Sequence, residues 1–175
     1  MPIPLTRMSD LAPKAEAVPE FYVDLDGTLK TDHKANQGDL VVRAAARTYR
    51  FDPRPGFREF LSALSRMGPV TLATAGGREY ASKVLRKMGA EDLFSRRVDA
   101  MSWRNGLPFR QGAVFVDDDL EMARMKVRCM RWPGTPSDEE ADRRIVLVPT
   151  YRGGPDSALM DVLPEIRKRV ASLGG

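Results

Sequence analysis

Two carboxylates, Asp24 and Asp26, lie at the end of a short apolar run, residues 21–25, and Gly27 follows them. Residues two apart in an extended segment point to the same side, so the two carboxylates face the same way and repel each other. A magnesium ion offsets that repulsion, because it accepts one or two carboxylates and keeps open positions for phosphate oxygens. The spacing therefore indicates a metal and phosphate site. The plainer alternative is a turn at Asp26, with Asp24 as a surface or helix-capping residue.

Three consecutive aspartates, residues 117–119, follow a second apolar run at residues 113–116. If both apolar runs are strands of one sheet, these acids are placed to complete the cation site that Asp24 and Asp26 begin. A solvated acidic turn that caps the next helix is the alternative explanation of the three acids.

A hydroxyl side chain and two glycines end a third apolar run. Thr74 and Ala75 are followed directly by Gly76 and Gly77. A hydroxyl and free backbone N–H groups beside glycines can hold phosphate oxygens where a helix begins. Taken alone, an N-cap for the helix that follows explains the same residues more simply.

Strands and helices alternate along the chain between these motifs. Strands are expected at residues 21–25, 70–75, 94–98, 113–116 and 145–148, and helices at residues 56–67, 78–88 and 157–173. This order predicts a three-layer, Rossmann-like α/β fold: a mainly parallel sheet with helices on both faces. Ligands of such sheets bind beyond the carboxyl ends of the strands, where the candidate residues fall. Prolines interrupt residues 1–18, so we expect a flexible N-terminal arm there and one domain over residues 19–175.

The composition fits a single globular domain: 175 residues, 42% hydrophobic and 30% charged. The one cysteine, Cys129, excludes an internal disulfide, and no apolar run reaches the roughly 18 residues of a membrane span. No secretory signal is evident, so a cytoplasmic location is the default expectation. The formal charge of +4 favours anionic partners, although mild basicity also serves solubility alone.

Taken together, the motifs resemble the haloacid-dehalogenase-like phosphatase superfamily. Within it they resemble the RNA polymerase II C-terminal-domain phosphatases and NLI-interacting-factor proteins, over about residues 20–170. The first motif is typical of the superfamily, and the later ones are typical of the narrower family. The matching segments, in family order, are FYVDLDGTL (21–29), RPGFREFL (54–61), TLATAGGREYASKVL (71–85), AVFVDDD (113–119) and VPTYRGGPDSALMDVLPEI (148–166).

This resemblance implies a magnesium-dependent phosphomonoesterase. Asp24 would be the nucleophile that forms an aspartyl-phosphate, and Asp26 would protonate the leaving oxygen and then activate the hydrolytic water. An Asp carboxylate can accept a phosphoryl group, and covalent catalysis splits one difficult displacement into two. The implied phosphate-binding residues are Thr74 and Ala75, and the implied magnesium ligands are Asp24, Asp26, Asp117 and Asp118.

The sequence departs from the family pattern at two points. Asp118 stands where the family usually has Asn, which makes the implied metal pocket more anionic. The family also expects a phosphate-binding lysine before the last acidic motif, and none lies between residues 87 and 126. Arg104 is the expected substitute, with Arg97 and Arg110 as alternatives, because an arginine can clamp phosphate through two bonds.

The intervals between the motifs are too short for an inserted cap domain. Residues 30–53 predict only a small β-hairpin flap or a short helix, so the expected fold is capless with an open site. An open site admits a phosphorylated macromolecule, and we expect a phosphoprotein in preference to nucleic acid. Phosphorylated nucleic-acid ends or small phosphates are alternative substrates. The missing lysine leaves a further alternative, a catalytically weak module that binds a phosphorylated or anionic partner.

Overall fold

The computed structural model describes residues 18–32 and 34–174. Five strands form the central sheet: β1 (Glu20–Val23), β4 (Val70–Ala73), β5 (Arg96–Val98), β6 (Ala113–Asp117) and β7 (Ile145–Leu147). Their order is β5-β4-β1-β6-β7, and every neighbouring pair is parallel. The predicted parallel sheet is therefore confirmed, and β1, which carries the first acidic motif, lies at its centre.

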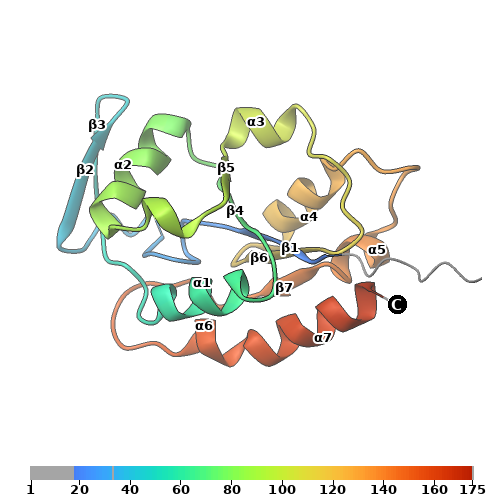
Figure 1. Cartoon of the computed structure of the whole chain (residues 1–175). Helices are drawn as coiled ribbons and strands as arrows, with labels where there is room; N and C mark the ends of the chain where they lie inside the picture. Colours follow the sequence, from blue (N-terminus) through green and yellow to red (C-terminus); the bar gives the residue numbers. More distant parts are fainter. Residues whose placement is uncertain (1–17, 33, 175) are drawn as a thin grey trace, which may run out of the picture.

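Helices cover both faces of the sheet, which gives the predicted three layers (Figure 1). Their bounds are α1 (Phe57–Ser65), α2 (Arg78–Met88), the 3-10 helix η2 (Glu91–Leu93), α3 (Ala100–Arg104), α4 (Leu120–Arg128), α5 (Asp138–Asp142), α6 (Ala158–Asp161) and α7 (Leu163–Leu173). In Figure 1, α1, α6 and α7 lie below the sheet, and α3 and α4 lie above it. The sheet is thus shielded from water on both sides, as a parallel sheet requires.

The strand β1 is apolar throughout its centre because it faces a core on each side. Phe21 and Val23 pack into the core beneath the sheet, while Tyr22 packs into the core on the opposite face. The Tyr22 ring stacks on Phe115 of β6 with 4.6 Å between the ring centroids. Successive side chains of β1 therefore enter the two cores alternately. Because a shift by one residue would exchange the faces, this alternation fixes the pairing register of β1, with Asp24 at its end.

The segment before α1 forms the predicted flap as a β-hairpin, β2 (Leu40–Ala44) and β3 (Arg47–Phe51). The hairpin packs against α2 at one end of the sheet (Figure 1). Lys83 of α2 donates a hydrogen bond to the Arg43 carbonyl oxygen at 2.7 Å, which ties the helix to β2. No additional domain interrupts residues 34–174, so the described part of the chain is capless as expected.

The helix expected over residues 157–173 is divided in two. α6 ends at Asp161 and α7 begins at Leu163, with Pro164 in its first turn. Proline has no N–H to donate to the carbonyl four residues earlier, and its ring collides with that carbonyl, so the helix cannot continue through it. In the first turn of α7 the missing N–H costs nothing.

Two short helices, α3 and α5, were not expected from the sequence. Both are five residues long, and each begins at a capping side chain: Asp99 for α3 and Ser137 for α5. The expected N-terminal arm falls almost wholly on residues 1–17, which lie outside the described part of the chain. Among the described helices, none has the length and apolar character that a bilayer span requires.

The hairpin turn yields a prediction about stability. Ala45 and Ala46 form a two-residue loop in which both φ angles are positive, at 46° and 60°. Such turns favour Asn-Gly, and an L-residue with a Cβ atom in this conformation is strained. We expect the double substitution Ala45→Asn, Ala46→Gly to raise the free energy of unfolding by about 1 kcal/mol. Urea denaturation checks this, and an unchanged or lower value would contradict the strain argument.

Candidate active site

Carboxylates from β1 and β6 meet at the carboxyl edge of the sheet. Asp24 follows β1, Asp117 ends β6 and Asp118 follows it, and one oxygen from each lies within 4.8 Å of the other two. The two strands are hydrogen-bonded neighbours, and the Asp24 N–H donates to the Val116 carbonyl oxygen at 2.9 Å. Three of the four expected metal ligands are therefore brought together, and their hard oxygen atoms suit a divalent cation such as magnesium.

Lys126 of α4 bridges two of these acids. Its Nζ lies 2.8 Å from Asp24 Oδ1 and 2.7 Å from Asp117 Oδ2, and its side chain is 1% exposed. α4 begins directly after the acidic motif and folds back along β6, so its buried face returns to the strand end. Sequence reasoning missed Lys126. The available signal was its spacing: Ala123, Lys126 and Val127 share one helical face, and a lysine there is buried against acids.

Burial destabilises the charged forms of two of these acids, Asp24 and Asp118. Burial raises the pKa of Asp24 to about 8, although the Lys126 ammonium pulls it down, and Asp117 adds to the rise. Burial also raises the pKa of Asp118. For Lys126, burial acts to lower the pKa, but Asp24 and Asp117 outweigh it and raise the pKa. The site thus has an excess of buried negative charge, which favours binding of a cation.

Asp26 lies apart from the acid cluster, with its carboxylate held by other groups. The Tyr80 hydroxyl donates to Asp26 Oδ1 at 2.6 Å, and Lys30 forms an ion pair with the same oxygen. Lys30 is itself buried, donates to the Thr31 carbonyl oxygen at 2.8 Å and lies over the Tyr80 ring. The structure therefore does not bring the Asp26 carboxylate to the expected metal ligands. Both contacts engage Oδ1, and Asp26 lines the cavity at this edge of the sheet.

The turn after β1 is fixed by a close approach and a buried arginine. Gly27 has φ +81°, and a Cβ atom there would lie 2.3 Å from Asp118 Oδ2, so only glycine fits. The Arg54 guanidinium donates to the Thr28 carbonyl oxygen at 3.2 Å and binds Asp156 through two bonds, at 2.9 and 3.0 Å. Arg54 thereby joins the turn to the segment before α6.

Thr74 lies directly after β4 and is buried beneath the start of α2. Its hydroxyl oxygen accepts the Gly76 N–H at 3.0 Å, and its carbonyl oxygen accepts the Trp103 indole N–H at 2.9 Å. Ala75 and Gly76 line the cavity above it. Of the expected phosphate-binding residues, Ala75 thus lines the cavity. Thr74 does not line it, but its hydroxyl holds the backbone of Gly76, which does.

Arg104 does not lie at the site, contrary to the expectation from the sequence. Its side chain is exposed, and its guanidinium lies 5.3 Å from the centroid of the Trp103 ring. Trp103 is buried in the core above the sheet, so the short α3 turns Arg104 outward. The alternatives, Arg97 and Arg110, are bonded to groups outside the cavity. The cation beside the acids is Lys126, from the helix after the last acidic motif rather than from the loop before it.

The acids at the strand ends line a cavity of about 890 Å³. The strand ends form its floor, and the hairpin and the first turn of α2 form one side. Residues from these three parts include Asp24, Asp26, Asp117 and Asp118; Ala44, Ala45 and Tyr49; and Gly76, Gly77, Arg78, Glu79 and Tyr80. The cavity is lined by a potential nucleophile and by a second carboxylate with its own hydrogen-bond donor. The buried Lys126 does not line it but bonds to two of its acids, Asp24 and Asp117. Phosphoryl transfer uses such groups.

The bonds from Arg54 to Asp156 and to the turn after β1, here called the Arg54 clamp, yield a prediction. Lysine lacks the planar guanidinium that makes two parallel bonds, so in Arg54→Lys both Asp156 and the turn carbonyls lose donors. The substitution should lower the free energy of unfolding by about 2 kcal/mol. The matched control is Arg58→Lys on the exposed side of α1, whose guanidinium donates only to carbonyls at the end of α2. Urea denaturation of both variants checks the difference. Equal losses would mean that the clamp has no special role.

Comparisons with known proteins agree with this geometry. Residues 22–140 match the family model described as NLI interacting factor-like phosphatase. Among curated proteins, no sequence match is found. The fold is similar to that of the fission yeast RNA polymerase II CTD phosphatase Fcp1 bound to beryllium fluoride, with a TM-score of 0.54 and 17% identity. That match covers 89% of this chain and 50% of the Fcp1 chain, so this chain spans about half of it.

Two further structures have the same fold. A second Fcp1 structure matches with a TM-score of 0.55 and 17% identity, over 89% of this chain and 48% of that one. A haloacid dehalogenase-like hydrolase from Xanthomonas campestris matches with a TM-score of 0.56 and 13% identity, over 91% and 99% of the two chains. The family match covers well over half of the sequence and includes the acids of both strand ends. The chain therefore belongs to the NLI interacting factor-like phosphatases, within the haloacid-dehalogenase-like fold.

Proposed function

We propose that this phosphatase hydrolyses phosphate monoesters through an aspartyl-phosphate on Asp24, with magnesium as its cofactor. The observation that carries the proposal is the position of Asp24. It lies at the end of the central strand, 6% exposed, beside Asp117 and Asp118 and in contact with Lys126. A nucleophilic carboxylate needs such neighbours, because it must approach a phosphate of the same charge.

Magnesium fits the donors at this edge of the sheet. Asp24, Asp117 and Asp118 offer carboxylate oxygens, and one oxygen from each lies within 4.8 Å of the others. When bound, magnesium would neutralise charge on the nucleophile and on the phosphoryl oxygens. The Asp26 carboxylate is bonded to Tyr80 and Lys30 instead, so it is free of the metal and available for proton transfer.

Each acid then has a separate task in two steps. In the first, an Asp24 oxygen bonds to phosphorus as the bond to the leaving oxygen breaks, and Asp26 gives its proton to that oxygen. In the second, water attacks phosphorus, its proton passes to Asp26, and the bond between phosphorus and Asp24 breaks. The products are an alcohol and phosphate, and both side chains return to their starting states.

Lys126 supplies the positive charge that the resemblance placed on a lysine before the last acidic motif. Its ammonium stabilises the ionised form of Asp24 and would lower the repulsion between that carboxylate and a phosphoryl group. The backbone at Ala75 and Gly76, at the start of α2, is the candidate contact for the phosphoryl oxygens.

A phosphorylated protein side chain is the proposed substrate class. The cavity is flanked by a hairpin rather than enclosed by an additional domain within the described residues, which leaves room for a polypeptide to carry the phosphate in. Two structures of similar fold are phosphatases of a protein tail, the RNA polymerase II CTD. Small phosphates and phosphorylated nucleic-acid ends are the competing substrates in a kinetic comparison.

The assignment of the nucleophile and the cation predicts the activity of three variants. With p-nitrophenyl phosphate and magnesium, Asp24→Asn should remove activity, and Lys126→Met should lower kcat by about a hundredfold or more, because a charge beside the transition state is lost. Arg104→Ala should retain activity within about twofold, since surface substitutions away from a site have small effects. Omitting magnesium should abolish turnover by the unmodified protein.

Circular dichroism controls for loss of folding in the Lys126 variant. Activity in Asp24→Asn equal to that of the unmodified protein would exclude the covalent mechanism. A larger loss in Arg104→Ala than in Lys126→Met would return the phosphate-binding role to Arg104.

The hydrogen bond from Tyr80 predicts an effect that depends on the leaving group. Tyr80 would be a positioning residue that holds Asp26 Oδ1 so that Oδ2 faces the leaving oxygen. Tyr80→Phe should lower kcat about tenfold for a phosphoserine peptide, whose alkoxide needs a proton, and much less for p-nitrophenyl phosphate, whose phenolate leaves unaided. Steady-state kinetics with both substrates check this. An equal loss for both would indicate a purely structural role for Tyr80.

A further inference from the structure

A second, smaller pocket lies between β2 and α2. It has a volume of about 320 Å³. We call it the α2–β2 groove, and its lining residues are Val41, Val42, Arg43, Lys83, Arg86 and Lys87. None of the groups proposed for phosphoryl transfer lines it, so the mechanism gives it no role.

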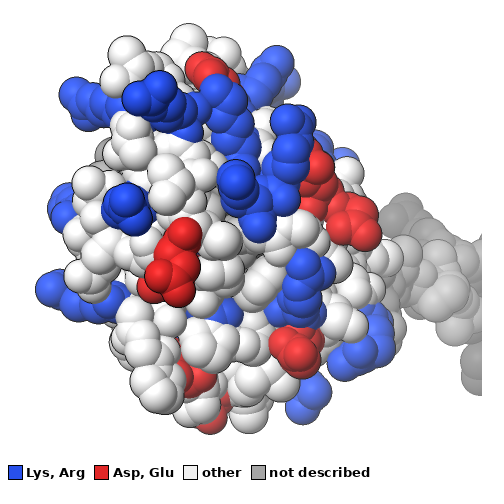
Figure 2. Space-filling model, turned by 90° about the vertical axis from the view of Figure 1, so that its left-hand side faces the viewer, with Lys and Arg blue, Asp and Glu red and all other residues white. Residues whose placement is uncertain are grey.

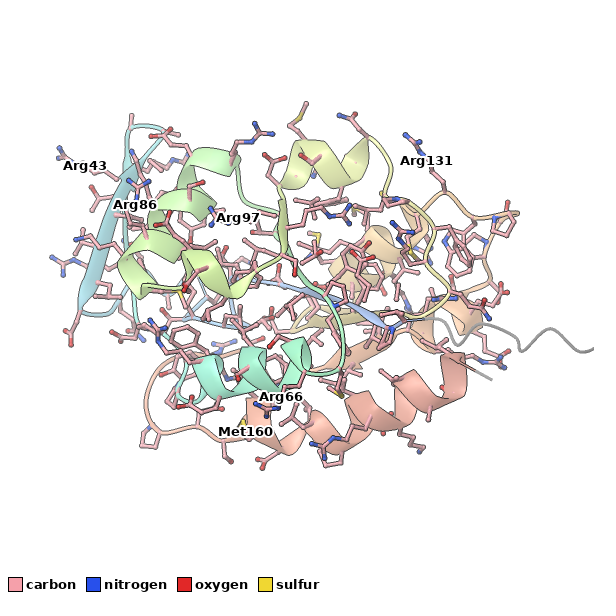
Figure 3. All side chains as sticks on the ribbon, in the orientation of Figure 1. Arg43, Arg66, Arg86, Arg97, Arg131 and Met160 are labelled. Atoms are coloured by element: carbon pink, nitrogen blue, oxygen red, sulfur yellow. The ribbon has the colours of Figure 1, made fainter. Side chains whose placement is uncertain are left out.

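The charged side chains that line the α2–β2 groove are all cationic. Figure 2 shows this face of the molecule, where Lys and Arg side chains outnumber acids. Arg43 and Arg86 lie together over the hairpin and α2 in Figure 3, far from Arg131 at the other end of the molecule. Among the described residues, no carboxylate forms an ion pair with Arg43 or Lys87. Lys83 pairs with Glu79 and Arg86 with Glu91, so the uncompensated positive charge of the groove belongs to Arg43 and Lys87.

The same two elements line the groove and the catalytic cavity. Ala44 of β2 and Glu79 of α2 line the cavity. Val42, which lies on the same face of β2 as Ala44, and Lys83, one helical turn from Glu79, line the groove. A helix rises about 1.5 Å per residue, so the seven residues from Glu79 to Arg86 cover about 10 Å. An extended peptide spans that distance with about three residues.

We propose that the α2–β2 groove binds an acidic stretch of the polypeptide substrate, which extends about three residues beyond the cavity wall at Glu79. The inference rests on the proposed phosphatase function and adds a determinant of substrate choice. Its cations complement aspartate, glutamate or a further phosphate, and its apolar residues, Val41 and Val42, complement aliphatic side chains. Single-stranded nucleic acid is disfavoured, because base stacking needs aromatic side chains and the groove lining has none.

The test compares two phosphoserine peptides that differ only in charge. One carries glutamates three to six positions from the phosphoserine, on either side, and the other carries glutamines. The unmodified protein should have a kcat/KM about tenfold higher for the acidic peptide, through KM, and the preference should shrink as salt is raised. Arg43→Glu, Lys87→Glu should abolish the preference and leave p-nitrophenyl phosphate hydrolysis unchanged.

The matched control is Arg66→Glu, Arg131→Glu, which changes the net charge equally at exposed sites away from the groove (Figure 3). The control should keep the preference for the acidic peptide. Equal kcat/KM for the two peptides, or equal losses in the groove and control variants, would overturn the proposal. Stronger competitive inhibition by an RNA oligonucleotide than by the acidic peptide would overturn it in favour of nucleic acid.

Binding of the same fluorescent peptides, measured by anisotropy, separates this proposal from the proposed function. If no monoester is hydrolysed, the phosphatase mechanism fails, yet tighter binding of the acidic peptide that disappears in Arg43→Glu, Lys87→Glu would still support the groove. Turnover with no difference between the peptides in binding would leave the mechanism intact and exclude the groove.

Discussion

Mutual repulsion of buried carboxylates is the constraint around which this structure is arranged. Asp24, Asp117 and Asp118 come together because β1 and β6 are parallel neighbours that end at the same edge. Removing such groups from water is costly unless a cation accompanies them. Lys126 supplies that cation from within the fold, and the turn at Gly27 allows the backbone to approach Asp118 closely. The site can thus exist before a metal arrives, with its nucleophile already in position.

A second set of contacts keeps the other acid independent of this cluster. Tyr80 reaches Asp26 from α2, and its ring also packs against Tyr49 of the hairpin, with 4.7 Å between the ring centroids. Lys30 forms an ion pair with Asp26, and its ammonium lies over the Tyr80 ring. Two carboxylates only two residues apart in sequence therefore have different environments: one is surrounded by acids and a lysine, the other by a phenol and a lysine. Different environments allow identical side chains to take different chemical roles.

Much of the fold could be predicted because each central strand is buried on both faces, so the apolar runs at β1, β4 and β6 are continuous. The acids that follow them could be placed together for the same reason. The helical spacing of Lys126 marks it as a buried lysine, but spacing does not show that Lys126 rather than Arg104 is the cation beside the acids. Which of them reaches the acids depends on how α4 returns along β6 and on how Trp103 anchors α3, and both are matters of tertiary packing. The separate position of Asp26 depends partly on Tyr80 of α2, which the local motif does not indicate, and partly on Lys30, four residues farther along the same segment.

The bond between Arg54 and Asp156 joins residues 102 positions apart, yet it secures the turn beside the nucleophile. Chains are made from the N-terminus, and β1 likewise needs β6 as a partner. A ribosome-bound chain that lacks residue 156 therefore carries the complete first motif without the contact that sets its geometry. The bond that secures the catalytic turn forms only after the segment before α6 has been made.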